Sequence, residues 1–250
     1  MGVKFMVNVP MNLSAPLTKQ TIASINQINV QGAKTSQTIL SLNRGRKSTA
    51  TPPNSAMPSS TCSRKIPSLL HNTKKGQKIP LFSSGQLARI KCCLGWNCAE
   101  TCDIDVSAFL LNFAGKVLGD SWFVFYGQTL SPDGSVRFNS NESIDRESIS
   151  IDLTKINSSV AKIVFVLTIH EAIEKNLNFS MVKDAYIRIL NRSNNEELVS
   201  FKMDEYYSNV TSMMIGEIYL HNNAWKFNAI GNGVTKDLAG LCELYGVHVV

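Results

Sequence analysis

The chain has 250 residues, of which 44% are hydrophobic and 18% charged, with a mean hydropathy of −0.03. This composition is typical of a water-soluble globular protein. The richest apolar run, residues 160–169 (VAKIVFVLTI), is far shorter than the ~20 residues that a membrane-spanning helix requires. The net charge of +6 is distributed unevenly, because residues 1–99 contain 13 Lys or Arg and no Asp or Glu. The remaining 12 basic and 19 acidic residues make residues 100–250 an acidic body behind a basic arm.

Residues 1–73 are rich in Ser, Thr, Asn and Gln and have no sustained apolar periodicity. We therefore predict a largely disordered basic arm over 1–73. Ile22, Ile25 and Ile28 recur at three-residue spacing, but a helix this short is marginal in water. Three functional alternatives remain for the arm: contact with an anionic surface, nucleic-acid binding through phosphates without sequence specificity, and an organelle-targeting presequence. Polar residues interrupt any secretory apolar segment near the start, so we expect a cytoplasmic protein with reduced thiols.

From residue 74 onward the chain consists of short segments rich in Val, Ile and aromatic residues, separated by turn sequences such as SPDG at 131–134. Helical periodicity is confined to residues 171–177 and 235–246. The pattern predicts a mainly β domain over 74–250, namely two antiparallel sheets packed as a β-sandwich with a few short helices. The expected strand segments are 87–94, 103–112, 121–126, 135–138, 147–153, 161–169, 184–191, 197–203, 211–220 and 224–230.

Two aspartates stand at the entrance of one apolar strand. Asp103 and Asp105 are two residues apart, so their side chains project from the same face of the strand. Two neighbouring carboxylates repel each other unless a cation or a donor lies between them, although solvent at a strand end screens the repulsion. The polar loop at 139–147 supplies further oxygen ligands of the kind that Ca²⁺ prefers. The two alternatives are a solvated strand end and a calcium site.

Four of the six cysteines lie within eleven residues, at Cys92, Cys93, Cys98 and Cys102. Their spacing does not match the paired C-x₂₋₄-C units of structural zinc sites, so free thiols are expected, with Cys98 and Cys102 the more reactive. His170 and Glu171 have no nucleophile placed near them in the sequence. No phosphate-binding glycine loop is present. The sequence therefore predicts a protein that is not an enzyme.

An ordered set of motifs covering residue 74 to the end resembles the TerD family of tellurium-resistance and general stress proteins, some of which are called cAMP-binding-protein-like. The motifs are LGWN at 94–97, DIDVSAFLL at 103–111, FVFYGQ at 123–128, SPDGSV at 131–136, KIVFVLTIHEA at 162–172, NFSMVKDAYIRI at 178–189, GEIYLHNNAWKFNAIGNG at 216–233 and LAGLCELYGVHV at 238–249. The resemblance implies a β-sandwich that binds Ca²⁺ at the D-x-D strand entrance and at an acidic loop after SPDGSV.

The metal ligands that this resemblance implies are oxygen-bearing residues from the strand entrance and the loop: Asp103, Asp105, Asn141, Glu142, Asp145 and Glu147. Several positions depart from the family pattern. Ser140 replaces an expected aspartate, Arg146 stands within the acidic run, and Asn97 replaces the aspartate of LGWD. Fewer carboxylates and an added guanidinium weaken the attraction for a dication. We therefore expect one calcium site that is weakened or lost.

The resemblance thus predicts a non-enzymatic, calcium-binding module in stress response or tellurite resistance. Its expected partners are other stress- and tellurite-resistance proteins, at or near the inner face of a membrane. The alternative is a metal-independent scaffold that recruits partners or anionic surfaces through its basic arm.

Overall fold

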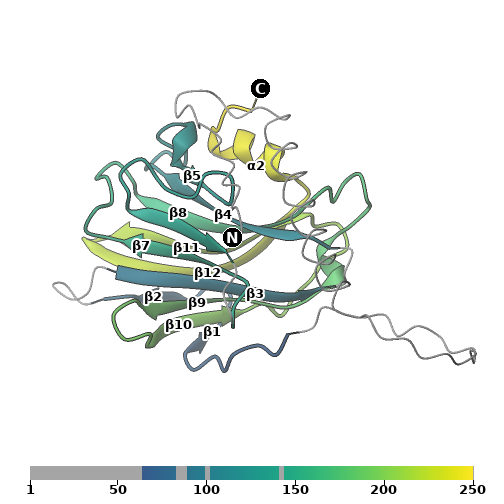
Figure 1. Ribbon diagram of the computed structural model, residues 1–250, viewed down its shortest axis with the longest axis horizontal. Helices are drawn as coiled ribbons and strands as arrows, with labels where there is room; N and C mark the ends of the chain where they lie inside the picture. Colours follow the sequence, from purple (N-terminus) through teal and green to yellow (C-terminus); the bar gives the residue numbers. More distant parts are fainter. Residues whose placement is uncertain (1–63, 83–88, 99–101, 141–143, 250) are drawn as a thin grey trace, which may run out of the picture.

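The computed structural model describes residues 64–82, 89–98, 102–140 and 144–249. The predicted arm, apart from its last residues, lies outside these ranges. Figure 1 shows the described part as two layers of strands with a short helix at one side. The two-sheet β-sandwich predicted from the sequence is confirmed. Within these ranges, no helix combines the length and the apolar character needed to cross a membrane.

Each layer is a sheet of six strands. The first sheet has the order β1-β10-β9-β3-β7-β6 and the second has the order β2-β12-β11-β8-β4-β5. All neighbours are antiparallel except β1 and β10, which run parallel. The strands are β1 (Asn72–Thr73), β2 (Lys78–Pro80), β3 (Arg89–Cys98), β4 (Ile104–Leu111), β5 (Phe123–Val124), β6 (Val136–Ser140), β7 (Glu147–Asp152), β8 (Lys162–Ile169), β9 (Val182–Asn191), β10 (Glu197–Lys202), β11 (Ser212–His221) and β12 (Ala224–Val234).

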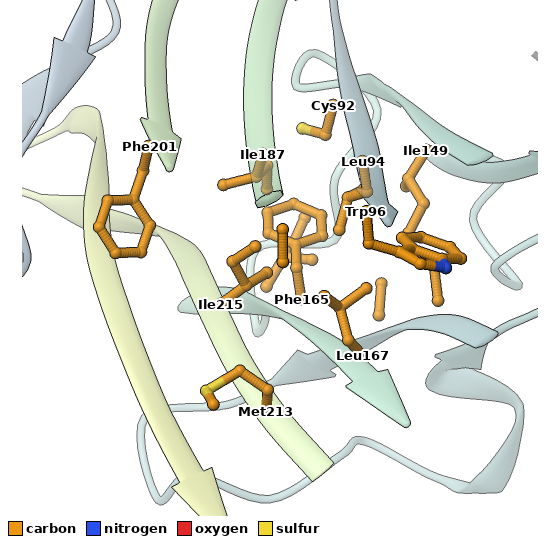
Figure 2. Close-up of a cluster of buried hydrophobic side chains, with 14 of the residues drawn as sticks. Cys92, Leu94, Trp96, Ile149, Phe165, Leu167, Ile187, Phe201, Met213 and Ile215 are labelled. Atoms are coloured by element: carbon orange, nitrogen blue, oxygen red, sulfur yellow. The ribbon is translucent and has the colours of Figure 1, made fainter. Parts of the chain in front are cut away.

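The main core lies between the two sheets, where alternate residues of each strand point inward. On β3 the inward residues are Ile90, Cys92 and Leu94, as their alternation predicts. Figure 2 shows Leu94 and Trp96 of one sheet close to Phe165 and Leu167 of the other. Burying this apolar surface is the main stabilising contribution to the fold.

A second apolar cluster covers the outer face of the second sheet. The helix α2 (Leu238–Tyr245) packs Leu241 and Cys242 against Phe109 of β4 and Val166 of β8. The helix begins where the Asp237 side chain accepts a hydrogen bond from the Gly240 amide, and it ends at Gly246, whose φ of 82° places it in the left-handed region. Figure 1 shows α2 beside β5.

The predicted helix over residues 171–177 is wrong. This segment forms a series of turns instead, followed by a 3₁₀ turn at Phe179–Met181. Glu171 and Asn176 have φ values of 50° and 53°, which a right-handed helix does not accommodate. The two left-handed residues bracket the segment and leave too little chain between them for a stable helix.

The described contacts begin before residue 74, where the sequence analysis starts the domain. β1 adds Asn72 and Thr73 to the first sheet, and the His71 amide donates to Glu197 Oε1 at 2.9 Å. Further upstream, Asn97 at the end of β3 binds both backbone groups of Arg64, with N–Oδ1 and O–Nδ2 distances of 2.8 and 3.1 Å. The sandwich therefore holds the chain from Arg64 onward.

Gly95 of β3 provides a test of the close packing on the outer face of the first sheet. A Cβ at this position would lie 2.5 Å from Cε1 and Cζ of Tyr186, whose ring is buried and whose hydroxyl is fixed by a 2.8 Å hydrogen bond to Asp145. We expect Gly95→Ala to destabilise the fold by about 1–3 kcal/mol, measured as a lower urea midpoint at an unchanged m-value. The matched control is Gly119→Ala, because a Cβ there would be 3.8 Å from its nearest neighbour, Trp122 Cδ1. Equal midpoints for the two variants would contradict the packing argument.

Candidate functional site

The first half of β4 carries polar side chains on the face that points away from the main core. Ile104 and Val106 point into the core, whereas Asp105 and Ser107 lie on the opposite face. Asp103 directly precedes the strand and is exposed. Its carbonyl oxygen accepts a 2.8 Å hydrogen bond from the His170 amide, which extends the pairing of β4 with β8 to this residue. The backbone at the strand entrance is therefore fixed, and so is the direction of both aspartates.

A third carboxylate reaches this place from the other sheet. Glu147 is the first residue of β7, and its Oε2 accepts a 2.9 Å hydrogen bond from the Val106 amide of β4. On this edge of β4, the neighbouring strand β5 pairs only with Ala108 and Phe109. The Val106 amide therefore has no strand partner there among the described residues, and the Glu147 carboxylate accepts its hydrogen bond instead. One glutamate thus links the edges of the two sheets.

Burial and neighbouring negative charge raise the pKa of two of these carboxyl groups, Asp105 and Glu147. Burial raises the pKa of Asp105 well above its usual value, and the charges of Asp103 and Glu147 raise it further. Burial also raises the pKa of Glu147 to about 7; the hydrogen bond from Val106 lowers it, Asp103 raises it, and Arg146 lowers it. A buried carboxylate resists ionisation unless positive charge is nearby. The cluster of Asp103, Asp105 and Glu147, called here the acidic cluster, therefore favours a proton or a cation.

Three hydroxyl groups beside the acidic cluster are buried and lack a hydrogen-bond partner within the described residues: Ser107 Oγ, Thr168 Oγ1 and Tyr126 Oη. Thr168 is the direct cross-strand neighbour of Asp105. The pKa of Tyr126 is raised, first by burial and then by the charges of Asp105, Asp103 and Glu147, so the phenol lies within electrostatic reach of all three acids. Buried hydroxyls are normally satisfied. Together with the acids they form an oxygen-rich surround that suits a hard cation.

Sequence reasoning did not identify these hydroxyls as site residues. The D-x-D spacing points to the two aspartates, and Ser107 continues the same alternation on β4. Thr168 and Tyr126 become neighbours only through the pairing of β4 with β8 and the turn after β5. The period-2 pattern of β4 could have indicated Ser107, whereas no local signal indicates the other two.

Asp145, a predicted ligand, is placed elsewhere. Its Oδ2 lies 2.8 Å from Arg188 Nη2, and its Oδ1 accepts hydrogen bonds from Arg188 Nε at 2.9 Å and Tyr186 Oη at 2.8 Å. This bidentate pair is almost fully buried. Its carboxylate charge is already neutralised by a guanidinium, which is the geometry that Arg–carboxylate pairs prefer. Asn141 and Glu142 lie outside the described residues, so three of the six predicted ligands, Asp103, Asp105 and Glu147, are found within electrostatic reach of one another.

Two departures from the family pattern fall on residues engaged elsewhere. Arg146 Nε donates to the Trp96 carbonyl oxygen at 2.7 Å, and its guanidinium lies 5.5 Å from the Trp96 ring centroid. Asn97 uses its amide nitrogen to donate to the Arg64 carbonyl oxygen and, at 3.2 Å, to Asp184 Oδ2. An aspartate could not make those donor contacts. The Asn97 departure therefore serves the attachment of Arg64 and takes no ligand from the acidic cluster.

The arrangement of the acids is open. Among the described residues, no three His, Cys, Asp or Glu side chains are already grouped closely enough to hold a metal ion. Two adjacent cysteines also diverge: Cys92 points into the core and Cys93 lies toward Asp145, whose charge adds to burial in raising the pKa of Cys93 to about 12. The acidic cluster is thus an electrostatic grouping at one edge of the sandwich that needs further oxygen ligands to enclose a cation.

Comparison with known proteins gives consistent relatives. The TerD domain family matches residues 69–245. The tellurium resistance protein TerD of Serratia marcescens is 42% identical over 164 residues, which cover 62% of this chain and 85% of that protein. General stress protein 16U of Bacillus subtilis is 36% identical over 187 residues, which cover 70% of this chain and 96% of that protein.

A solved structure supports the fold independently. The crystal structure of the protein of unknown function SAV2460 superposes with a TM-score of 0.51 and 19% sequence identity, covering 62% of this chain and 94% of that chain. At this identity the likeness concerns the fold alone. The family match spans most of the described sandwich, including the strand that carries Asp103 and Asp105 and the strand that begins at Glu147. The chain belongs to the TerD family.

Proposed function

We propose that the chain is a calcium-binding module of the TerD family that acts, without catalysis, in stress response or tellurite resistance. The observation that carries the calcium part is the acidic cluster, in which two half-buried residues, Asp105 and Glu147, have carboxyl groups with raised pKa values and a third acid, Asp103, lies beside them. The biological setting is taken from the names of the relatives, which are a tellurium resistance protein and a general stress protein.

A cation offsets both costs of the acidic cluster. It compensates for the burial of Asp105 and Glu147, and it replaces the repulsion among the three acids by attraction. The available donors are carboxylate and hydroxyl oxygens, which are hard ligands, and Ca²⁺ takes about six to eight of them in flexible geometries. Asp103, Asp105 and Glu147 would hold the ion, with hydroxyls and backbone carbonyls completing its shell.

The same contacts support a weakened site. Asp145 is neutralised by Arg188 and adds no charge to the acidic cluster. Arg146 lies close enough to lower the pKa of Glu147, so its positive charge also opposes a dication there. Because the number of charged ligands tunes calcium affinity over several decades, we propose an affinity at the weak end of the range.

Calcium titration tests the proposal directly. The full-length chain should show a rising melting temperature as calcium increases to millimolar concentrations, because the ion binds the native state preferentially. Asp105→Asn should have two opposite effects: a higher melting temperature in EDTA, since it removes a buried and repelled charge, and a loss of the calcium-dependent increase. The matched control is Glu174→Gln, an exposed acid on the turn after β8. A wild-type chain that does not respond to calcium, by melting or by calorimetry, would refute the calcium part.

The raised pKa of Glu147 predicts a pH dependence in calcium-free buffer. Its pKa is about 7 in the folded chain and 4.5 in its unperturbed form, so the folded state holds a proton that the unfolded state has lost between these values. The free energy of unfolding should therefore fall as pH rises from 4.5 to 7, because keeping the Glu147 proton in the folded chain becomes increasingly costly. The total decrease from this residue is about 3 kcal/mol at most, and below pH 4.5 the residue has no further effect. Urea unfolding of wild type and Glu147→Gln across this range measures the effect. The variant should lose this part of the slope, and saturating calcium should reduce the slope in wild type; identical profiles for the two proteins would contradict the assignment.

The basic arm generates a separate prediction about partners. Its excess of Lys and Arg predicts binding to anionic surfaces that weakens as salt screens the charges. Deletion of residues 1–63 should abolish sedimentation with phosphatidylserine vesicles at low salt. The deletion should end there, because Arg64 and β1 belong to the sandwich. Equal sedimentation of both chains would exclude the arm as the recruiting segment for such surfaces.

A further inference from the structure

Two sulfur atoms from separate elements lie in contact at one end of the sandwich, and a third sulfur, a thiol, lies beside the backbone of one of them. Cys98 is the last residue of β3, Cys102 lies two residues before β4, and Met181 ends the 3₁₀ turn before β9. Cys102 Sγ lies 3.9 Å from Met181 Sδ, and Cys98 Sγ lies 3.3 Å from the Cys102 carbonyl oxygen. Cys98 also pairs with Val182, the residue that follows Met181. The pairing of β3 with β9 therefore places Cys98 beside the turn that carries Met181.

We propose that Cys98, Cys102 and Met181 form a binding site for one soft monovalent metal ion, with Cu(I) as its typical member. Thiolate and thioether ligands select soft ions over hard ones. Two sulfurs that each lie ~2.3 Å from a metal at trigonal or tetrahedral angles are roughly 3.8–4.0 Å apart, if the metal–thiolate distance of zinc sites is taken as a guide. The 3.9 Å separation of Cys102 Sγ and Met181 Sδ matches this requirement.

The three side chains differ in exposure in a way that suits an ion site at the surface. Cys102 is 6% exposed and belongs to the core, Cys98 is half-buried, and Met181 is 37% exposed. The core cysteine is held rigidly by its packing, while the methionine offers the flexible ligand on the solvent side.

The chemistry of the site separates it from zinc and from calcium. In the described residues no His, Asp or Glu joins these cysteines in a metal-holding group of three, so the proposed ligands are sulfur atoms alone, whereas zinc sites commonly include nitrogen or oxygen ligands. Calcium takes oxygen ligands, which here belong to the acidic cluster. The sulfur site does not depend on the proposed calcium function, and each cysteine releases its proton when it binds the metal.

The test is an anaerobic titration of the full-length chain with Cu(I) in competition with a chromophoric Cu(I) chelator. The wild-type chain should withdraw one Cu(I) at this site, and X-ray absorption should show sulfur neighbours only. Met181→Leu keeps the volume of the side chain and removes the thioether, and it should weaken binding by roughly tenfold or more. Cys98→Ser should abolish binding at the site. Met181 is exposed, and Cys98 is half-buried at the margin of the core where serine is close to it in size, so the variants should fold, which circular dichroism verifies.

Two controls make the result specific. Met214→Leu changes a half-buried methionine on β11, away from the three sulfurs, and should bind Cu(I) like wild type. Asp105→Asn should also bind Cu(I) like wild type, which separates the sulfur site from the acidic cluster. The proposal is overturned if the wild-type chain fails to compete for Cu(I), if Met181→Leu and Cys98→Ser both bind as tightly as wild type, or if equimolar Zn²⁺ displaces the ion.

Discussion

The hydrogen bond from the Val106 amide to Glu147 sets the constraint around which this edge of the sandwich is organised. A carboxylate that starts on one sheet satisfies the backbone of the other, so it must lie between them, where water screens its charge poorly. Asp105 is held beside it by the alternation of β4. The fold therefore concentrates negative charge at a position where charge is costly. The costs are tolerable because the rest of the sandwich buries a continuous apolar core.

The chain handles its buried acids in two different ways. Asp145 receives a fixed internal cation, because the register of β9 places Arg188 and Tyr186 beside it on the outer face of the first sheet. Asp105 and Glu147 receive no comparable partner within the described residues, and their pKa values rise accordingly. Asp145 is tied to Arg188, and removing either partner would leave an uncompensated buried charge. Asp105 and Glu147 have no such fixed partner in the described part of the chain, so each can release a proton when a cation binds beside it. Only the second arrangement can respond to the surroundings of the protein.

Much of the architecture follows from local patterns in the sequence. The alternation of Ile90, Cys92 and Leu94 places β3 correctly, and the terminal helix follows from its apolar spacing and its Gly246 stop. The turn segment at 171–177 was misjudged because two left-handed residues, Glu171 and Asn176, override its helical composition. Neither is a glycine, and although asparagine is enriched in the left-handed conformation, glutamate is not, so the composition gives no warning at Glu171.

The candidate site was less predictable because most of its contacts join residues far apart in the sequence. The D-x-D spacing identifies Asp103 and Asp105 from one strand alone. The acidic run does not reveal that Glu147 turns toward β4 while Asp145, two residues earlier, turns to Arg188. The register between strands decides these orientations, and so it decides which acids share a neighbourhood.

Asn97 gives the start of the described chain a defined point of attachment. Its side chain accepts from and donates to the backbone of Arg64, in the manner of a single rung of a sheet, and it is itself fixed by Asp184. The end of β3 therefore decides where the backbone enters the sandwich, so the register of that strand positions Arg64 as well as its own neighbours.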